Sequence, residues 1–183
     1  MKEYIDIVDG NGEFTGEVLE KEEAHCLGKW HVTSHVWIYN SKGEILFQKR
    51  SLTKSTFPGL WDISVAGHIS TGETPLQGAY REVLEEIGLD IDVEDLEKVF
   101  VFKESHYHDN IDWYNNEFHH VFLYKYDGTV SDLELQEEEV DDVRFLSLED
   151  FRKELDDPIK NKSFVSNADY YDKIIAVISD KIN

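Results

Sequence analysis

The chain has 183 residues, of which 40% are hydrophobic and 13% aromatic, values typical of a globular protein rather than a disordered one. Its 18 Lys and Arg residues against 39 Asp and Glu residues give a formal net charge of −21. A surface this negative repels nucleic acid and anionic membranes, so we expect neither as a partner. An anionic substrate would have to arrive with a cation, although the charge could also serve solubility alone.

A single cysteine, Cys26, excludes an internal disulfide and favours a cytoplasmic location. The N-terminal stretch MKEYIDIVDG lacks the apolar segment of a signal peptide. No run of about 18 apolar residues occurs either, so we expect no membrane span. The length is typical of one domain, and we expect a single domain over residues 1–183.

The first elements are predicted to be mostly strands. Asn11-Gly12 lies between two alternating segments and predicts a small hairpin over residues 4–19. The next elements are a short helix over residues 20–25 and two strands over residues 31–40 and 44–50, joined by an NSKG turn.

The clearest helix covers residues 74–88. Thr74 can cap its N-terminus, Pro75 fits the first helical position, and Gln77 completes a capping box. Gly88 can end the helix in the left-handed conformation. An apolar stripe at helical spacing consists of Leu76, Ala79, Tyr80, Val83, Leu84 and Ile87.

The second half of the chain continues this alternation of strands and helices. Strands over residues 94–104 and 118–128 flank a polar, aromatic loop over residues 105–117, and helices follow over 146–155 and 167–182. This order predicts an α/β (α+β) fold in which a mixed β-sheet is packed between helices.

Three glutamates of the predicted helix, Glu82, Glu85 and Glu86, are spaced i, i+3 and i+4 and therefore share one face. Like charges at this spacing destabilise an isolated helix by about a few tenths of a kcal/mol per pair. The face could simply be solvated. Clustered carboxylate oxygens also suit a hard cation, Mg²⁺ or Mn²⁺. Gly67 would let its backbone approach such a ligand, with its carbonyl in the metal shell.

The segment around these glutamates resembles the Nudix box, G-x5-E-x7-R-E-U-x-E-E-x-G-U with U aliphatic. It matches at Gly67, Glu73, Arg81, Glu82, Val83, Glu85, Glu86, Gly88 and Leu89. We expect an ion pair between Arg81 and Glu73 that holds the loop and the helix together. The preceding PGLWDISVAGH is also similar to Nudix proteins. The resemblance covers about residues 30–155, which we expect to be the core of the domain, and it implies the Nudix fold.

The resemblance also implies an enzyme that uses Mg²⁺ or Mn²⁺ to cleave a pyrophosphate bond in a nucleoside di- or triphosphate or a nucleoside diphosphate derivative. By the same resemblance Glu82 and Glu86 are metal ligands, and Glu85 is a ligand or the base that activates water. Many families draw a further glutamate from a later loop. Glu137, Glu138 and Glu139 stand there, and Glu138 is the predicted metal ligand, unless these charges are merely solvated.

The flanking sequence is similar to isopentenyl diphosphate isomerase, another enzyme of the Nudix fold. Shared features are Ala24-His25, His31, the Gln-Lys-Arg end of a strand, the Lys54 loop, and Trp61 ahead of Gly67-His68. The isomerase needs a catalytic cysteine just before the Gly-His pair, where this chain has Ala66. A methyl group cannot donate the proton of a thiol, and Cys26 does not match that position. Isomerisation is therefore the disfavoured alternative.

The isomerase also binds a metal through three histidines and two glutamates. His25, His31 and His68 occupy the histidine positions and Glu117 one glutamate position, but Asn115 replaces the other. The resemblance thus implies either a weakened second metal site or ordinary hydrogen-bonded polar side chains.

Substrate contacts are expected from Lys49, Arg50 and Lys54, which are rare positive charges near the presumed active face; a solvated strand end is the alternative. Five aromatic residues could stack a base or form a local core: His106, Tyr107, His108, Trp113 and Tyr114. A non-catalytic nucleotide-binding module is a further alternative to the enzyme. The N-terminal hairpin and the C-terminal helix could form a homodimer contact.

Overall fold

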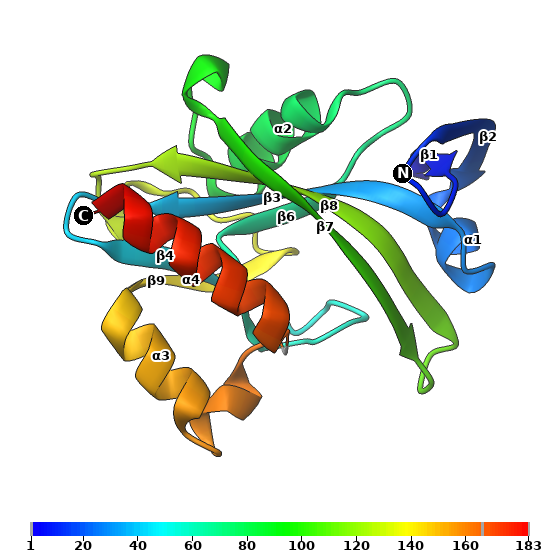
Figure 1. Cartoon of the computed structure of the whole chain (residues 1–183). Helices are drawn as coiled ribbons and strands as arrows, with labels where there is room; N and C mark the ends of the chain where they lie inside the picture. The colour runs from blue at the N-terminus through cyan, green and yellow to red at the C-terminus, as the bar shows by residue number, and fades with distance from the viewer. Residues whose placement is uncertain (1, 166, 183) are drawn as a thin grey trace.

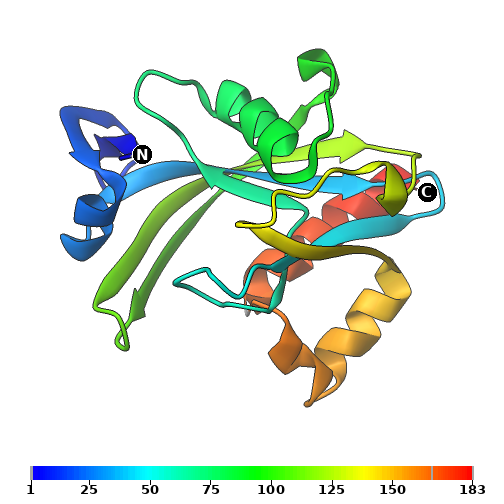
Figure 2. The ribbon, with the colours of Figure 1, turned by 180° about the vertical axis from the view of Figure 1, so that it is seen from behind.

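The computed structural model describes residues 2–165 and 167–182, so Met1 and Asn183, the ends of the predicted domain, lie outside the described residues. Within these ranges the chain forms a branched, nine-stranded mixed sheet with helices on both faces (Figures 1 and 2). This arrangement confirms the predicted mixed sheet between helices. None of the described helices is both long enough and apolar enough to cross a membrane.

The strands are β1 (Tyr4–Val8), β2 (Phe14–Glu20), β3 (Trp30–Tyr39), β4 (Glu44–Arg50), β5 (Trp61–Asp62), β6 (Val65–His68), β7 (Glu97–His108), β8 (Trp113–Lys125) and β9 (Val140–Ser147). The α-helices are α1 (Lys21–Cys26), α2 (Pro75–Ile87), α3 (Leu148–Asp156) and α4 (Ala168–Ile182). Short 3-10 helices are η1 (Val93–Asp95), η2 (Val130–Asp132) and η3 (Lys160–Ser163). The predicted N-terminal hairpin and all four predicted helices are present.

Strand β3 is the centre of the sheet. One of its edges pairs in parallel with β8 from His31 to Tyr39. Its other edge is shared in turn by β1, β6 and β4, all antiparallel. Strand β4 pairs with β3 only at Ile45, next to their turn, and otherwise pairs with β5 and β9. The sheet therefore divides beyond this turn, and the short strand β6 lies at the division.

Two apolar cores cover the two faces of the sheet. On one face, Val36 and Ile38 of β3 pack with Val83 of α2. On the other face, Trp37 packs with Tyr170 of α4, and α3 joins the same core. Because side chains alternate along a strand, neighbouring residues of β3 serve opposite cores. Figures 1 and 2 show α2 on one side of the sheet and α3 and α4 on the other.

Helix α2 has the caps that the sequence predicts. The Thr74 side chain accepts a hydrogen bond from the backbone N–H of Gln77, and the Gln77 side chain accepts one from the backbone N–H of Thr74 at 2.9 Å. Gly88 ends the helix with a φ of 66°, in the left-handed region. Leu84 is 41% exposed, so the buried stripe is narrower than predicted. The two caps therefore fix where the helix that carries the three glutamates begins and ends.

The segment 105–117, predicted as a loop, is instead mostly strand. Strands β7 and β8 pair continuously from His108 and Trp113 at their tip, with the turn over residues 109–112. Aromatic side chains favour strands, and the tilted rings of Tyr107 and Tyr114 pack against each other across the pair with centroids 4.5 Å apart. Strands β5 and β6 were not predicted because two and four residues are too short to show a period.

Removing the helix cap should lower stability without touching the carboxylates. We expect Thr74→Ala to lower the free energy of unfolding by about 1 kcal/mol, because an N–H of the first turn loses its acceptor. Thr71→Ala, at an exposed position outside the helix, is the matched control and should change it by less than about 0.5 kcal/mol. Urea denaturation measures both, and equal effects would contradict the role of the cap.

Candidate active site

The three glutamates of α2 lie at different depths. Glu86 is 5% exposed, while the side chains of Glu82 and Glu85 are 13% and 52% exposed. Gly67 of β6 lies directly against Glu82, since a Cβ on Gly67 would sit 2.0 Å from Glu82 Cδ. Only glycine leaves room for this contact. The helix thus presses a carboxylate onto the backbone of β6.

Arg81 links the helix, the preceding loop and β6. Its guanidinium lies 2.9 Å from Glu73, 2.7 Å from Glu82 and 3.0 Å from Glu85. It also donates to the backbone carbonyl of His68 at 2.9 Å. The predicted ion pair with Glu73 is therefore present, and its hydrogen bond is the main cause that raises the pKa of Arg81.

Glu86 lies deeper than its neighbours and is held by neutral groups. Gln48 of β4 donates from Nε2 to Glu86 Oε2 at 3.2 Å, and the backbone of Ala66 supplies a further hydrogen bond. Gln48 is only 2% exposed, and its Oε1 is buried without a hydrogen-bond partner. A buried amide oxygen that has lost its hydrogen bonds to water and has no protein donor is typical of a site that holds an ion or a water.

Burial disfavours the charged form of both inner carboxylates. It raises the pKa of Glu82 to about 7, although Arg81 acts in the opposite direction. It raises the pKa of Glu86 well above its usual value, and the charges of Glu82 and Glu139 add to this effect. Both inner carboxyls therefore keep their protons to a higher pH than an exposed glutamate does.

This donor set fits a hard divalent cation. The oxygens of Glu82 and Glu86, and the unpaired amide oxygen of Gln48, are the ligand type that Mg²⁺ and Mn²⁺ prefer. A cation would also favour the charged form of both carboxylates, which burial and the neighbouring carboxylates disfavour. The chemistry of the residues thus agrees with a metal at this face of α2.

The three positive side chains predicted to contact phosphate each have a carboxylate partner. Lys49 pairs with Asp141 at 3.4 Å, Arg50 with Asp62 at 3.2 Å, and Lys54 with Glu139. Arg50 also donates to the Thr56 carbonyl, so it holds the loop between β4 and β5. Lys54 is the one whose charge acts on Glu86, which places it beside the carboxylates.

The later loop brings one glutamate toward this cluster. The charge of Glu139 acts on Glu86, and its side chain is 33% exposed. Glu138 is exposed, and its backbone carbonyl accepts a hydrogen bond from Thr53. Side-chain position thus favours Glu139 over Glu138 as the glutamate that approaches Glu86.

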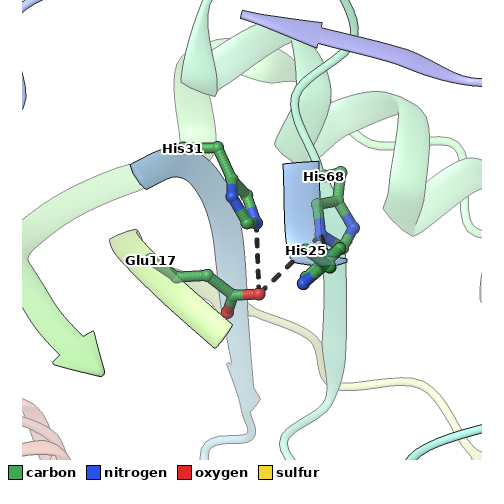
Figure 3. A group of neighbouring side chains, drawn as sticks. All are labelled: His25, His31, His68 and Glu117. Atoms are coloured by element: carbon green, nitrogen blue, oxygen red, sulfur yellow. Dashed lines mark hydrogen bonds and ion pairs between the residues drawn. The ribbon is translucent and has the colours of Figure 1, made fainter. Parts of the chain in front are cut away.

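A second cluster brings together His25, His31, His68 and Glu117, whose ligand atoms all lie within 4.8 Å of one another (Figure 3). They come from four elements, α1, β3, β6 and β8. Glu117 Oε1 lies 3.3 Å from His31 Nε2 and 3.8 Å from His68 Nε2. The sequence predicted this set only through the isomerase resemblance, and the fold assembles it.

Backbone carbonyls orient the histidines of this cluster. His25 Nδ1 lies 2.7 Å from the Tyr114 carbonyl and His31 Nδ1 lies 3.0 Å from the Lys29 carbonyl. A carbonyl only accepts, so each Nδ1 carries the proton and each Nε2 presents a lone pair. This arrangement is typical of histidines that bind metal. His31 Nε2 is buried and has no hydrogen-bond partner.

The low pKa values of two histidines and the amide oxygen of Asn115 also suit this cluster to a metal ion. Burial lowers the pKa of His25 to about 4, with His31 contributing, and burial likewise lowers the pKa of His68 well below its usual value. Neutral imidazole is the form that binds metal. Asn115, which replaces the isomerase glutamate, has a buried Oδ1 without a partner two residues before Glu117. Alternation along β8 places both on the same face.

The aromatic residues of the β7–β8 tip contact one another and the second cluster. Trp113 stacks on His25 with ring centroids 4.2 Å apart. His108 is 9% exposed and lies 5.0 Å from Phe57, measured between ring centroids. Trp113 and His108 thus take part in local packing, whereas Tyr107 is 45% exposed.

Two features were missed by reasoning from the sequence. One is Gln48, the buried amide beside Glu86. The other is a polar network on the α4 face of the sheet that includes His35, His119 and Tyr170. The sequence carried a signal for this network, since polar residues two apart on a buried strand share one face. They are His31, Thr33 and His35 on β3 and Glu117 and His119 on β8.

Comparison with known proteins agrees with this geometry. The sequence profile of the NUDIX domain matches residues 29–167. A Nudix hydrolase of Listeria monocytogenes is 39% identical over 150 residues, which are 82% of each chain. Nudix hydrolase 3 of Arabidopsis thaliana is 38% identical over 154 residues, and the match covers 82% of this chain but 20% of that protein. The chain therefore spans about a fifth of the Arabidopsis relative.

The chain is also similar in part of its sequence to isomerases, and in its fold to solved structures. Isopentenyl-diphosphate Delta-isomerase of Pectobacterium atrosepticum is 42% identical over 83 residues, 45% of this chain and 46% of that one. A crystal structure from Deinococcus radiodurans superimposes with a TM-score of 0.67 at 20% identity, covering 96% of this chain and 99% of that one. The NUDIX domain of Shewanella oneidensis NrtR, complexed with ADP ribose, gives a TM-score of 0.52 at 16% identity and covers 67% and 75%.

The NUDIX profile covers most of the chain, and the Listeria relative matches along most of both sequences. Most of the box residues that carried the resemblance lie on α2, and Gly67 of β6 lies against them. Members of the Nudix family generally use divalent metal ions. This chain belongs to the Nudix hydrolase family.

Proposed function

We propose that this protein hydrolyses a pyrophosphate bond in a nucleoside di- or triphosphate, or in a nucleoside diphosphate derivative, with Mg²⁺ or Mn²⁺ as cofactor. The observation that carries the proposal is the buried pair of Glu82, which lies against Gly67, and Glu86, which bonds to the backbone of Ala66; both have raised pKa values. Carboxylates in this state are stabilised by binding a cation. A cation bound there would offset the charge of the diphosphate and polarise the attacking water.

The residues of the chain divide the remaining work. Glu82 and Glu86 bind the cation, with the Gly67 carbonyl as a further ligand. Gln48 holds Glu86 in place by donating a hydrogen bond from Nε2 to its carboxylate. Glu85 lies at the surface, 3.0 Å from Arg81, and is either a ligand or the base that takes a proton from the attacking water.

Lys54 is the strongest candidate for a phosphate contact among the three predicted cations. Its positive charge acts to lower the pKa of Glu86, so it lies near that carboxylate. Its ion-pair partner Glu139 is next in sequence to Glu138, the predicted metal ligand of the later loop. When a diphosphate binds with its cation, Lys54 can exchange Glu139 for a phosphate oxygen. Glu139 would then be free to approach the cation. Lys49 and Arg50 lie at the end of β4, where Lys49 pairs with Asp141 of β9 and Arg50 holds the loop through Thr56.

The substrate class follows from the family and from charge. The net charge of −21 disfavours a free polyphosphate and favours one that arrives with a cation. The NrtR domain was solved with ADP ribose, which makes nucleoside diphosphate derivatives a natural starting point. Isomerisation of an isoprenoid diphosphate is the second candidate, because an isomerase is 42% identical to this chain over 83 residues. Ala66 argues against it, since no thiol stands at that position.

We also propose that His25, His31, His68 and Glu117 bind a second metal ion, with Asn115 Oδ1 as a further oxygen ligand. Three imidazole nitrogens and one carboxylate suit a transition-metal ion rather than Mg²⁺. The carbonyl of His68 accepts from Arg81, so the two sites share one strand. An ion there would rigidify β6 beside the carboxylates.

The remaining expectations concern the whole protein. We propose that residues 1–183 act as one domain, since β1 bridges to Ser70 before the helix and Tyr170 of α4 bonds to Trp37 of β3. Cytoplasmic location and a homodimer stay predictions.

Replacing Glu86 should abolish turnover. We expect Glu86→Gln to lower kcat by more than about 100-fold, because the cation loses a ligand. Glu94→Gln, at an exposed position, should leave it unchanged. The assay measures phosphate or nucleotide release from ADP, CDP, GTP, ADP-ribose and UDP-glucose with Mg²⁺ and with Mn²⁺. No turnover of any compound by the unaltered protein would defeat the proposal, and so would equal turnover by Glu86→Gln.

Without metal, the protein should lose stability as the pH rises through the titration of Glu82. Its folded pKa of about 7 lies above the usual value of 4.5, so ionisation disfavours folding. The penalty is absent below about pH 4.5 and complete above about pH 7.

We therefore expect Glu82→Gln in EDTA to be as stable as the unaltered protein near pH 4.5, and more stable by roughly 3 kcal/mol at pH 8. Urea denaturation at both pH values measures the difference. A difference that does not grow with pH would show that Glu82 is already compensated without metal.

The second cluster should retain a transition metal independently of the carboxylates. We expect protein purified without chelator and reconstituted with Co²⁺ to bind about one equivalent that survives Glu86→Gln but is lost in His31→Asn. Elemental analysis after desalting measures the stoichiometry. His120→Asn, on the opposite face of β8, is the matched control. Retention of cobalt by His31→Asn would exclude this cluster as its site.

A further inference from the structure

Two glutamates lie directly opposite each other on β7 and β8. Glu104 is the cross-strand partner of Glu117, so both side chains leave the same face of the sheet. Glu117 is 7% exposed, and the side chain of Glu104 is 32% exposed. Like charges at directly opposite positions destabilise a pair of strands. The register therefore places a second carboxylate beside the carboxylate of the histidine cluster, and another group is needed to offset their repulsion.

His119 lies between these two carboxylates. Its Nε2 is 2.9 Å from Glu104 Oε2, and its Nδ1 is 3.6 Å from Glu117 Oε2. A carboxylate oxygen accepts hydrogen bonds, so the Nε2–H of His119 donates to Glu104. Thr33 Oγ1 lies 2.7 Å from His119 Nδ1, and the ring stacks on His35 with centroids 4.0 Å apart. These contacts fix a buried imidazole against both glutamates.

The neighbours of Glu117 divide its two carboxylate oxygens. Oε1 lies 3.3 Å from His31 Nε2 and 3.8 Å from His68 Nε2 (Figure 3). Oε2 is the oxygen that lies 3.6 Å from His119. This contact is longer than a hydrogen bond, so it restricts the rotation of the carboxylate without adding a hydrogen bond. Glu117 thus turns one oxygen toward the histidines of the cluster and the other toward His119.

Glu104 is held in turn by the start of the C-terminal helix. Asn167 donates from Nδ2 to Glu104 Oε1 at 2.9 Å. The Oδ1 of the same side chain accepts from the backbone N–H of Tyr170, in the first turn of α4, at 3.2 Å. Both oxygens of Glu104 therefore have donors, one beside α4 and one on β8. A chain of contacts runs from α4 through Glu104 and His119 to Glu117.

We propose that Glu104, acting through His119, is a positioning residue for Glu117. This rests on the proposed second metal site. The ligands of a metal ion are generally oriented by partners that do not touch the ion, and loss of such a partner weakens binding. Here the partner is an imidazole that a second carboxylate holds in place. Because Glu117 directs only Oε1 at the cluster, imidazole nitrogens dominate the donor set, which favours a transition-metal ion.

Titration with Co²⁺ tests the role of Glu104, in the Glu86→Gln background so that the carboxylate site does not contribute. We expect Glu104→Ala to weaken Co²⁺ binding by about 10-fold or more, because His119 loses the partner that orients it. The visible absorption spectrum of the bound ion, which reports its ligands, should change as well. Glu104→Gln keeps an oxygen acceptor for His119 and should restore most of the affinity and the original spectrum. Glu97→Ala removes the ion pair with Lys181, another contact between β7 and α4, and should change neither.

A double-mutant cycle tests the path through His119. His119→Phe keeps a ring but no nitrogen, so it should weaken Co²⁺ binding as Glu104→Ala does. Because Glu104 acts through His119, combining the two substitutions should weaken binding no more than either one alone. Thermal unfolding of each variant checks that it is folded. Glu104 is partly exposed, so its own substitutions leave the core intact and decide the question even if His119→Phe does not fold.

The assignment is overturned if Glu104→Ala leaves affinity and spectrum unchanged, if Glu104→Gln binds as weakly as Glu104→Ala, if Glu97→Ala has an equal effect, or if the effects of Glu104→Ala and His119→Phe add. Failure of the second metal site gives a different result, because protein with Glu104 and His119 intact would then bind no Co²⁺, and the assignment would fall with the site. Failure of the hydrolase proposal is separate again, since turnover and its loss in Glu86→Gln test that reaction.

Discussion

The guanidinium of Arg81 is the interaction on which the carboxylate site depends. It reaches Glu73 on the loop, Glu82 and Glu85 on its own helix, and the His68 carbonyl on β6. Through these contacts it offsets the repulsion within one helical turn and fixes the helix against the strand. In the part of the chain that the structure describes, Glu86 has no lysine or arginine ion pair of its own. The protein thus pairs the outer carboxylates with Arg81 and leaves the innermost one without a basic partner.

Strand β6 is where the chemistry of the two faces meets. Gly67 has no side chain, which leaves room for Glu82 on the α2 side of the sheet. Ala66 and His68 point to the other side. The four residues of β6 therefore contact the carboxylates on one face of the sheet and contribute His68 to the histidine cluster on the other. Because β6 pairs with β3 alone among the described strands, its free edge is available to Glu86.

Local features of the fold were predictable, and long-range ones were not. The caps of α2, Thr74 and Gly88, follow from residues in and next to one helix, and the three glutamates of the box were placed correctly on it. The segment 105–117 was predicted wrongly as a loop because its polar residues masked the strand preference of its aromatic side chains. The three carboxylates share a helix, so their spacing alone indicated a shared face.

Residues that meet only through the fold needed other information. His25 and Glu117 lie far apart in sequence, and only the resemblance to the isomerase linked them. Gln48 and Glu86 come from a strand and a helix that no local pattern connects. The contact between Tyr170 and His35 depends on where α4 docks, which hydrophobic periodicity does not specify.

The central claim is that the acidic turn of α2 binds divalent cations. Titration with Mn²⁺, followed by electron paramagnetic resonance, tests it most directly when it is done in the His31→Asn background, which removes the histidine cluster. The account predicts at least one bound Mn²⁺ per chain, and its loss when Glu82→Gln and Glu86→Gln are added. Identical binding curves with and without these two substitutions would contradict it.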